Sequence, residues 1–345
     1  MTPSRPCTMT DVARRAGVHP ATVSRALRDD PRITLAQRKK VQRAAAELGY
    51  RTNPLIAALM SARRAGHGPT YQATLAYVTD VPPDRRAWFD RDFGELLVGA
   101  RTHAESKGYH LEELNLHPLA THAPRATEIL LARGIHGLMI APLYSVDEPV
   151  AIDWSHFATV AFGYSFTQAT VSRVAHNTFG GYLLAAHHGR AAGRRRIGLV
   201  LQRRVHEKVE KRWLAAALLD QSEHPARDRV PPLLLDGLDG RAFGTWYGRH
   251  RPDVIICVDT GPILGCLKAL GRRVPRDTAV VGLDRRPRDR GIAGVNQDYA
   301  RLGAAAIDLL VSLLNRNARG RLDHPVTVHV DGDWVAGRSL GRPPR

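Results

Sequence analysis

From about residue 74 onward, short apolar runs alternate with longer amphipathic segments, and this alternation constrains the fold more than any other feature. The runs have the length of buried strands, and the segments between them repeat apolar residues at helical spacing. Alternating strands and helices predict βαβ units with parallel sheets. The predicted strands are Leu75–Val78, Gly137–Ala141, Thr159–Phe162, Ile197–Leu201, Val254–Val258 and Ala279–Leu283.

The alternating region is too long for one open sheet in a chain of 345 residues, so two lobes are expected. We predict a core over residues 74–340. Its first lobe takes residues 74–163 and 296–322, and its second takes residues 164–295 and 323–340. A ligand is expected in the crevice where the strands' carboxyl ends meet.

The N-terminal region has a different texture, with three short helical patterns. Residues 8–11 form a capping box, and Gly17 is a natural end for that helix. A second helix is expected from Pro20 to about residue 28, and a third begins after the cap at Thr34 and ends at Gly49. Two helices joined by a tight turn and supported by a third predict a helix-turn-helix DNA-binding domain over residues 8–52.

The second helix of such a domain lies in the major groove. Arg25 can donate two hydrogen bonds to guanine, although a phosphate contact or a surface salt bridge is the alternative. Apolar contact with a thymine methyl is what Pro20 and Ala21 can offer. The candidates for phosphate contacts are Thr10, Thr22 and Ser24.

The charge agrees with a polyanionic partner. The formal net charge is +17, and residues 1–70 hold 13 Lys and Arg against 4 Asp and Glu. The three cysteines form no CxxC pair and the histidines lack ligand spacing, so no metal site and no cofactor are predicted. There is no apolar signal segment or membrane span, so a cytoplasmic protein is expected. No nucleotide-binding, zinc-protease or serine-hydrolase motif is present, so no enzymatic activity is expected.

Four segments resemble the lactose-repressor (LacI) family of bacterial transcriptional regulators. They are Met9–Val18, Thr22–Leu27, Ala46–Pro54 and Thr278–Asp284. The resemblance covers nearly the whole chain. It implies a homodimer with a helix-turn-helix headpiece, a hinge helix over residues 53–66, a linker over residues 67–73, and a two-lobed core like that of periplasmic sugar-binding proteins.

The resemblance also implies functional residues in the hinge helix. Asn53, Ala57 and Leu59 would contact DNA, and Leu59 would wedge into the minor groove at the operator centre. Packing of Leu59 against its dimer mate is the alternative. His19 stands where the family usually has a serine cap, and Thr52 replaces the usual proline. Arg28 stands where the family usually has asparagine, and it would add a phosphate contact.

In the family, a small molecule, most often a sugar, binds between the lobes. Asp284 follows a predicted strand and can accept hydrogen bonds from sugar hydroxyls, although it could instead cap the next turn. Asp259 could bind the effector or cap the helix that follows it. The other candidates are His176, Asn177, Arg212, Gln297 and Phe93.

These features predict a sequence-specific transcriptional regulator, a repressor. It binds a pseudo-palindromic operator in double-stranded DNA, and a small effector, expected to be a sugar, switches its affinity. The alternative is a largely non-specific DNA-binding protein whose core senses nothing.

Overall fold

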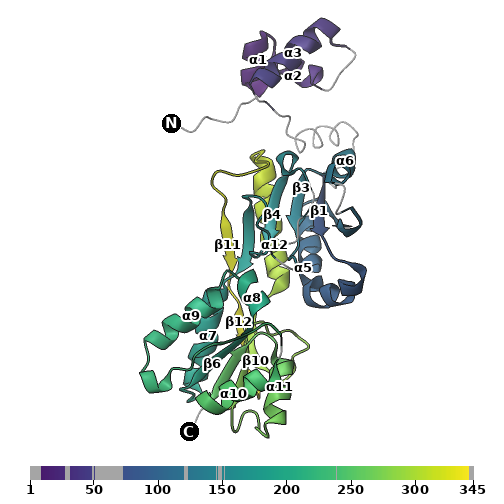
Figure 1. The fold of residues 1–345 in the computed structure, drawn as a ribbon. Helices are drawn as coiled ribbons and strands as arrows, with labels where there is room; N and C mark the ends of the chain where they lie inside the picture. The colour runs from purple at the N-terminus through teal and green to yellow at the C-terminus, as the bar shows by residue number, and fades with distance from the viewer. Residues whose placement is uncertain are drawn as a thin grey trace. The chain divides into compact units, whose positions relative to one another are not determined.

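The computed structural model describes residues 9–27, 32–48, 50, 73–119, 123–144, 146, 150, 152–237 and 239–341 (Figure 1). They form two compact units, one within residues 1–72 and a larger one that begins at Ala73. The predicted hinge helix, residues 53–66, lies outside the described residues, and so does Arg28.

The N-terminal unit consists of α1 (Met9–Ala16), α2 (Pro20–Ala26) and α3 (Leu35–Glu47). Gly17 ends α1 in the left-handed region, with φ at +60°, which glycine adopts without a steric penalty. The Thr34 hydroxyl accepts the Gln37 amide at 3.3 Å, so the cap predicted for the third helix is confirmed.

A small apolar core holds these three helices together. Val12, Val23 and Val41, one from each helix, are completely buried in one cluster. Arg15 also ties α1 to α3, because its guanidinium lies 2.7 Å from the Glu47 carboxylate. The outward-facing side of α2 is therefore not needed to hold the three helices together, and it is available for another role.

Lobe one contains a six-stranded sheet in which all neighbouring strands are parallel. From edge to edge its strands are β11 (Thr327–Val330), β5 (Ser172–His176), β4 (Ala158–Phe162), β3 (Gly137–Ile140), β1 (Ala73–Thr79) and β2 (Tyr109–Asn115). Its α-helices are α5 (Arg86–Ser106), α6 (Ala123–Ala132) and α12 (Tyr299–Asn315). A Cβ on Gly99 of α5 would lie 2.4 Å from the Ala300 Cα of α12, so these two helices meet backbone to backbone.

Lobe two contains a second six-stranded sheet. Its strands are β12 (Asp333–Val335), β10 (Ala293–Asn296), β9 (Ala279–Gly282), β8 (Val254–Cys257), β6 (Ile197–Gln202) and β7 (Leu233–Leu235). Its α-helices are α7 (Thr178–Ala191), α8 (Arg203–Lys208), α9 (Arg212–Ser222), α10 (Gly240–His250) and α11 (Thr260–Ala269). Short 3-10 turns in the two lobes span Pro83–Arg85, His117–Leu119, Trp154–His156 and Ala226–Asp228.

Both faces of this second sheet are buried. Leu199 and Ile256 pack on the side of α7 and α9, whereas Val200 and Ile255 pack on the side of α10 and α11. The alternation follows the two-residue period of a strand, and it explains why these strands are continuous apolar runs. The strand β12 differs from the predicted parallel arrangement, because it pairs antiparallel with β10.

The chain crosses between the lobes after β5, after β10 and after β11. One predicted boundary is therefore wrong: residues 164–176 and 323–330, assigned to the second lobe, contain β5 and β11 of the first sheet. Both strands contain polar residues that are partly exposed or exposed, so they lack the continuous apolar run that marked the other strands. Among the described helices, none is both long and apolar enough to cross a bilayer.

Candidate functional site

A cavity of about 350 Å³ lies between the two lobes, at the carboxyl ends of their strands. Lobe one contributes aromatic side chains, among them Phe93 of α5 and Tyr299 of α12. Lobe two contributes the acidic residues Asp259 and Asp284, which follow β8 and β9. The volume suits a small ligand, and the mixture of aromatic and polar walls is typical of ligand pockets.

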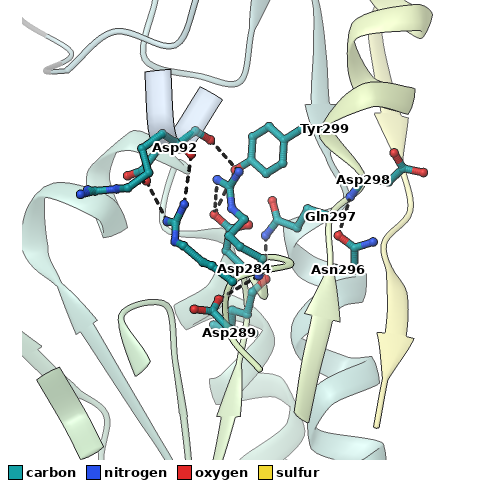
Figure 2. Close-up of polar contacts among 11 residues, drawn as sticks. Asp92, Asp284, Asp289, Asn296, Gln297, Asp298 and Tyr299 are labelled. Carbon is teal, nitrogen blue, oxygen red and sulfur yellow. Dashed lines mark hydrogen bonds and ion pairs between the residues drawn. The ribbon is translucent and has the colours of Figure 1, made fainter. Parts of the chain in front are cut away.

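Asp284 anchors the polar wall of this cavity (Figure 2). Its Oδ2 accepts a hydrogen bond from Arg286 Nη2 at 2.9 Å and another from the Tyr299 hydroxyl at 3.0 Å. Burial and the charge of Asp284 raise the pKa of Tyr299, so its hydroxyl stays protonated and donates. The Arg286 guanidinium also stacks 3.6 Å from the centre of the Tyr299 ring.

Four side chains that line the cavity carry buried polar atoms with no hydrogen-bond partner among the described residues. They are the Asp284 Oδ1, both ring nitrogens of His176, the Thr178 hydroxyl and the Trp213 indole nitrogen. Burial lowers the pKa of His176 to about 3, so its imidazole is neutral and offers one donor and one acceptor. A buried polar group without a hydrogen-bond partner raises the free energy of the protein. A ligand that forms hydrogen bonds with several such groups removes this cost and binds more tightly.

Asp259 occupies the N-cap position of α11, but its side chain makes no capping hydrogen bond. Its Oδ2 instead accepts from Gln202 Nε2 at 2.9 Å at the cavity wall. Desolvation by burial raises the pKa of Asp259, and the nearby Arg204 opposes that rise. The carboxylate therefore faces the cavity rather than the helix.

Two arginines that follow β9 reach across to lobe one. Arg286 Nη1 donates to the backbone oxygen of Asp92 at 2.6 Å, and Arg288 Nη2 donates to the Asp92 carboxylate at 2.8 Å (Figure 2). On another side of the cavity, Arg204 lies 4.5 Å from the centre of the Tyr144 ring. These contacts join the lobes, and through Arg286 they are linked directly to Asp284.

The structure brings together five of the seven residues predicted for the effector site. Asp284, Asp259, His176, Gln297 and Phe93 all line the cavity. The buried Gln297 also donates to the Leu283 carbonyl at 2.7 Å, which fixes the turn before Asp284.

Asn177 and Arg212 do not line the cavity. The Asn177 side chain accepts the Gly180 amide at 3.0 Å, so it caps α7. Arg212 lies 4.4 Å from the Tyr164 ring centre and donates to Glu210 at 2.9 Å.

Sequence reasoning missed four residues that line the cavity, Thr178, Trp213, Arg286 and Tyr299. For Trp213 the only signal in the sequence was its place in a helical pattern of apolar residues, and that pattern predicts a core residue equally well.

The candidate DNA-contacting residues of the N-terminal unit lie on α2 and the start of α1. Arg25 and Thr10 are exposed, and Thr22 and Pro20 are half-buried. Ala21 and Ser24 belong to α2, and Asn53, Ala57 and Leu59 lie outside the described residues. Within the described parts of the chain, no three His, Cys, Asp or Glu side chains are grouped so that they could hold a metal ion.

Comparison with known proteins agrees with both halves of this architecture. Residues 8–53 match the model described as bacterial regulatory proteins, lacI family, and residues 186–340 match a periplasmic binding protein-like domain. The chain therefore joins a LacI-family DNA-binding domain to a periplasmic binding protein-like domain. It is thus a DNA-binding transcriptional regulator with an effector-binding domain, in a family whose members are not enzymes.

Relatives that match the chain over its full length are distant in sequence. The repressor PurR of Yersinia pestis bv. Antiqua (strain Antiqua) is 24% identical over 356 residues, 98% of each chain. The regulator GntR of Pseudomonas aeruginosa is 52% identical over 62 residues, 18% of each chain.

Solved structures share the fold. A complex of the transcriptional regulator CelR with cellobiose aligns with a TM-score of 0.56 at 21% identity, covering 96% of this chain and 99% of that one. The lac repressor dimer bound to operator and the anti-inducer ONPF aligns with a TM-score of 0.55 at 20% identity, covering 97% and 99%. The predicted fold class is therefore confirmed.

Proposed function

We propose that this chain is a homodimeric, sequence-specific transcriptional repressor. A small, uncharged, polyhydroxylated ligand, a sugar, binds between its lobes and switches its operator affinity. The observation that carries the proposal is the cavity in which buried donors and acceptors of Asp284, His176, Thr178 and Trp213 have no partner among the described residues. As a regulator of the chromosome, the protein would act in the cytoplasm.

The charge of the cavity supports an uncharged ligand. Three carboxylates, those of Asp92, Asp259 and Asp284, are matched by three cations. These cations are Arg204, Lys208 and Arg286. A charged ligand would leave an uncompensated charge in a partly desolvated site, whereas sugar hydroxyls both donate and accept. The cellobiose in the CelR complex, a relative in fold, also favours a sugar.

The proposed switch couples the ligand to the contacts between the lobes. A hydroxyl that donates to Asp284 Oδ1 would bind the same carboxylate that holds Arg286, and Arg286 holds the Asp92 backbone across the cleft. Ligand binding would thus change how firmly the lobes are held together. A coupling of about 1–3 kcal/mol between the ligand and the operator is sufficient for regulation.

On DNA, we assign base reading to the exposed face of α2. Arg25 would donate to a guanine, Pro20 and Ala21 would contact a thymine methyl, and Thr22 would contact phosphate. Further contacts are assigned to Thr10, Ser24, Arg28, Asn53, Ala57 and Leu59. The full-length similarity to a protein named as the repressor PurR supports repression rather than activation.

The first experiment selects bound fragments of the source genome at near-physiological salt, with the wild-type protein and with Arg25→Ala. A pseudo-palindromic consensus is expected, and Arg25→Ala should lose preference at one base position and about 1–3 kcal/mol of affinity. Sequence-independent capture would contradict the proposal and favour a non-specific DNA-binding protein. Equal weakening of Arg25→Ala on all sequences would make Arg25 a phosphate contact only.

The ligand is tested separately by thermal shift with neutral sugars, sugar acids and amino sugars. A neutral sugar should stabilise the wild-type protein and fail to stabilise Thr178→Val and Trp213→Phe, which remove single hydrogen-bonding groups. Stabilisation by a sugar acid or amino sugar alone would contradict the charge argument.

A further inference from the structure

Lobe two is strongly basic, whereas lobe one is slightly acidic. Residues 177–296 and 331–345 contain 25 Lys and Arg against 14 Asp and Glu. Residues 73–176 and 297–330 contain 12 Lys and Arg against 15 Asp and Glu. The surplus of positive charge in the core therefore belongs to one lobe and is not a general property of the surface.

The topology gathers much of this charge at one edge of lobe two. Parallel strands all begin at the same edge, opposite to the carboxyl ends that form the cavity, and antiparallel β12 ends there. The loops at this edge hold 12 arginines against five acidic residues. These loops, with the last two residues of α10 counted among them, are residues 193–196, 223–232, 249–253, 271–278, 289–292 and 336–341.

We call this surface the basic edge and define it by its exposed arginines. They are Arg195, Arg227, Arg229, Arg249, Arg251, Arg272, Arg273, Arg276, Arg290 and Arg338. Of the exposed large apolar side chains in the described parts of the chain, one, Leu270, lies beside these loops, directly before residues 271–278. A surface of many cations with a single exposed apolar side chain at its margin suits a phosphate backbone better than a membrane, because interfacial segments enter a membrane through several apolar side chains.

Two further arginines bind the loops to one another. Arg194 Nη2 donates to the carbonyl of Pro275 at 2.8 Å, and Arg196 Nη2 donates to the carbonyl of His250 at 2.5 Å. The Asp253 carboxylate also accepts the amides of Arg195 and Arg196, at 2.8 and 3.0 Å. These bonds fix residues 193–196, 249–253 and 271–278 relative to one another, so the backbone positions from which their arginines extend are fixed as well.

Among the described residues, one of the ten exposed arginines, Arg273, forms an ion pair with an acidic residue of these loops, Asp277, at 3.5 Å. Asp253, Asp277 and Asp289 each accept backbone amides of neighbouring residues. Arg195, Arg249 and Arg276, from three different loops, have side chains with no hydrogen bond or ion pair to the described residues. Their charge is therefore available to a partner.

The dimensions of the basic edge fit one strand of a duplex. Six strands spaced about 4.8 Å apart extend over roughly 24 Å. One DNA strand carries a phosphate about every 3.4 Å along the axis, so this length matches roughly seven phosphates. Guanidinium groups donate two hydrogen bonds to a phosphate, and the edge presents such groups along its whole length.

From these observations we infer that the basic edge binds the phosphate backbone of DNA, as a second DNA-binding surface besides the headpiece. The inference rests on the proposed function, because that function brings the protein to DNA. A protein with both surfaces holds two DNA segments at once.

The test is bridging of two duplexes by the full-length protein. A biotinylated duplex on streptavidin beads captures the protein, and retention of a fluorescent duplex of random sequence is measured as the salt concentration is raised. The test variant combines Arg195→Gln, Arg249→Gln and Arg276→Gln. The control combines Arg101→Gln, Arg125→Gln and Arg321→Gln, which remove the same charge from exposed positions in lobe one.

The wild-type and control proteins should retain the second duplex, and the basic-edge variant should lose it. Each lost phosphate contact lowers the slope of log affinity against log salt by about 0.9, so three contacts lower it by roughly 3. Equal retention by the two variants would overturn the inference, because retention would then come from the headpieces. No retention by the wild-type protein would also overturn it.

A vesicle control separates DNA from acidic lipid. If the wild-type protein floats with phosphatidylserine vesicles, the basic-edge variant does not, and neither retains the second duplex, the surface binds membrane and the inference is wrong. The genomic consensus is read through the headpiece, so it should be the same for wild-type protein and basic-edge variant. Loss of that consensus in the wild-type protein would refute the proposed function instead.

Discussion

Removing the Asp284 carboxylate should destabilise the core because it leaves a buried charge without its partner. The side chains of Arg286 and Asp284 are only 8% and 16% exposed, with 2.9 Å between Arg286 Nη2 and Asp284 Oδ2. Asp284→Ala removes this bond and the one from the Tyr299 hydroxyl at 3.0 Å. Arg286 keeps the Asp92 carbonyl at 2.6 Å and the stacking on Tyr299.

Because these contacts remain, the expected loss of stability lies at the low end of the range for breaking a buried ion pair. We expect Asp284→Ala to lower the free energy of unfolding by about 3 kcal/mol. Asp284→Asn keeps an acceptor for both donors and loses only the charge, so it should cost about 1–2 kcal/mol. The double variant Asp284→Ala/Arg286→Met removes the unpaired cation and should recover at least about 1.5 kcal/mol of the Asp284→Ala loss.

The measurement is urea unfolding of the full-length protein, followed by tryptophan fluorescence and circular dichroism. The double-variant cycle isolates the interaction because the two side chains touch. Strictly additive costs in the double variant would refute the reasoning. So would a loss below about 1 kcal/mol in Asp284→Ala, since that is the range of an exposed pair.

Three further predictions concern other parts of the chain. Thr34→Ala removes the acceptor for the Gln37 amide and should destabilise the headpiece by about 1 kcal/mol, while Thr34→Ser keeps it; equal amide-exchange protection in the two variants would contradict the capping role. Burial lowers the pKa of His176 from 6.5 to about 3, so its contribution to stability is present above pH 6.5 and is lost as the pH falls toward 3. The loss amounts to about 2 kcal/mol at pH 5. The free energy of unfolding should therefore fall less steeply between pH 7 and pH 5 for His176→Gln than for the wild-type protein. Parallel plots of unfolding free energy against pH for the two proteins would contradict this role of His176. Arg288→Ala breaks a partly exposed pair with Asp92, so it should change stability by less than about 1 kcal/mol yet open the cleft, which small-angle scattering would report as a larger radius of gyration than for Arg101→Ala; identical scattering would show that the other contacts between the lobes hold the cleft without Arg288.

The sequence by itself determined the features that depend on neighbours along the chain. The cap at Thr34 needs only the next three residues, and the central strands need only apolar runs of a buried strand's length. Asp284 was found because residues that follow parallel strands collect at one edge of a sheet, whatever the details of packing. Motif order in the same local segments also indicated the family.

Only the tertiary structure decided which side chains face the cavity. His176 and Asn177 are adjacent, yet His176 ends β5 in the cavity wall, and Asn177 turns away to cap α7. Arg286 and Tyr299 were invisible as site residues because their roles depend on each other and on Asp92, about 200 residues away along the chain. The basic edge has the same origin, because its arginines lie in loops that only the parallel topology brings together. Local hydrogen bonds and periodicity are written in short stretches of sequence, whereas a cavity or a charged surface is made by elements that pack across the chain.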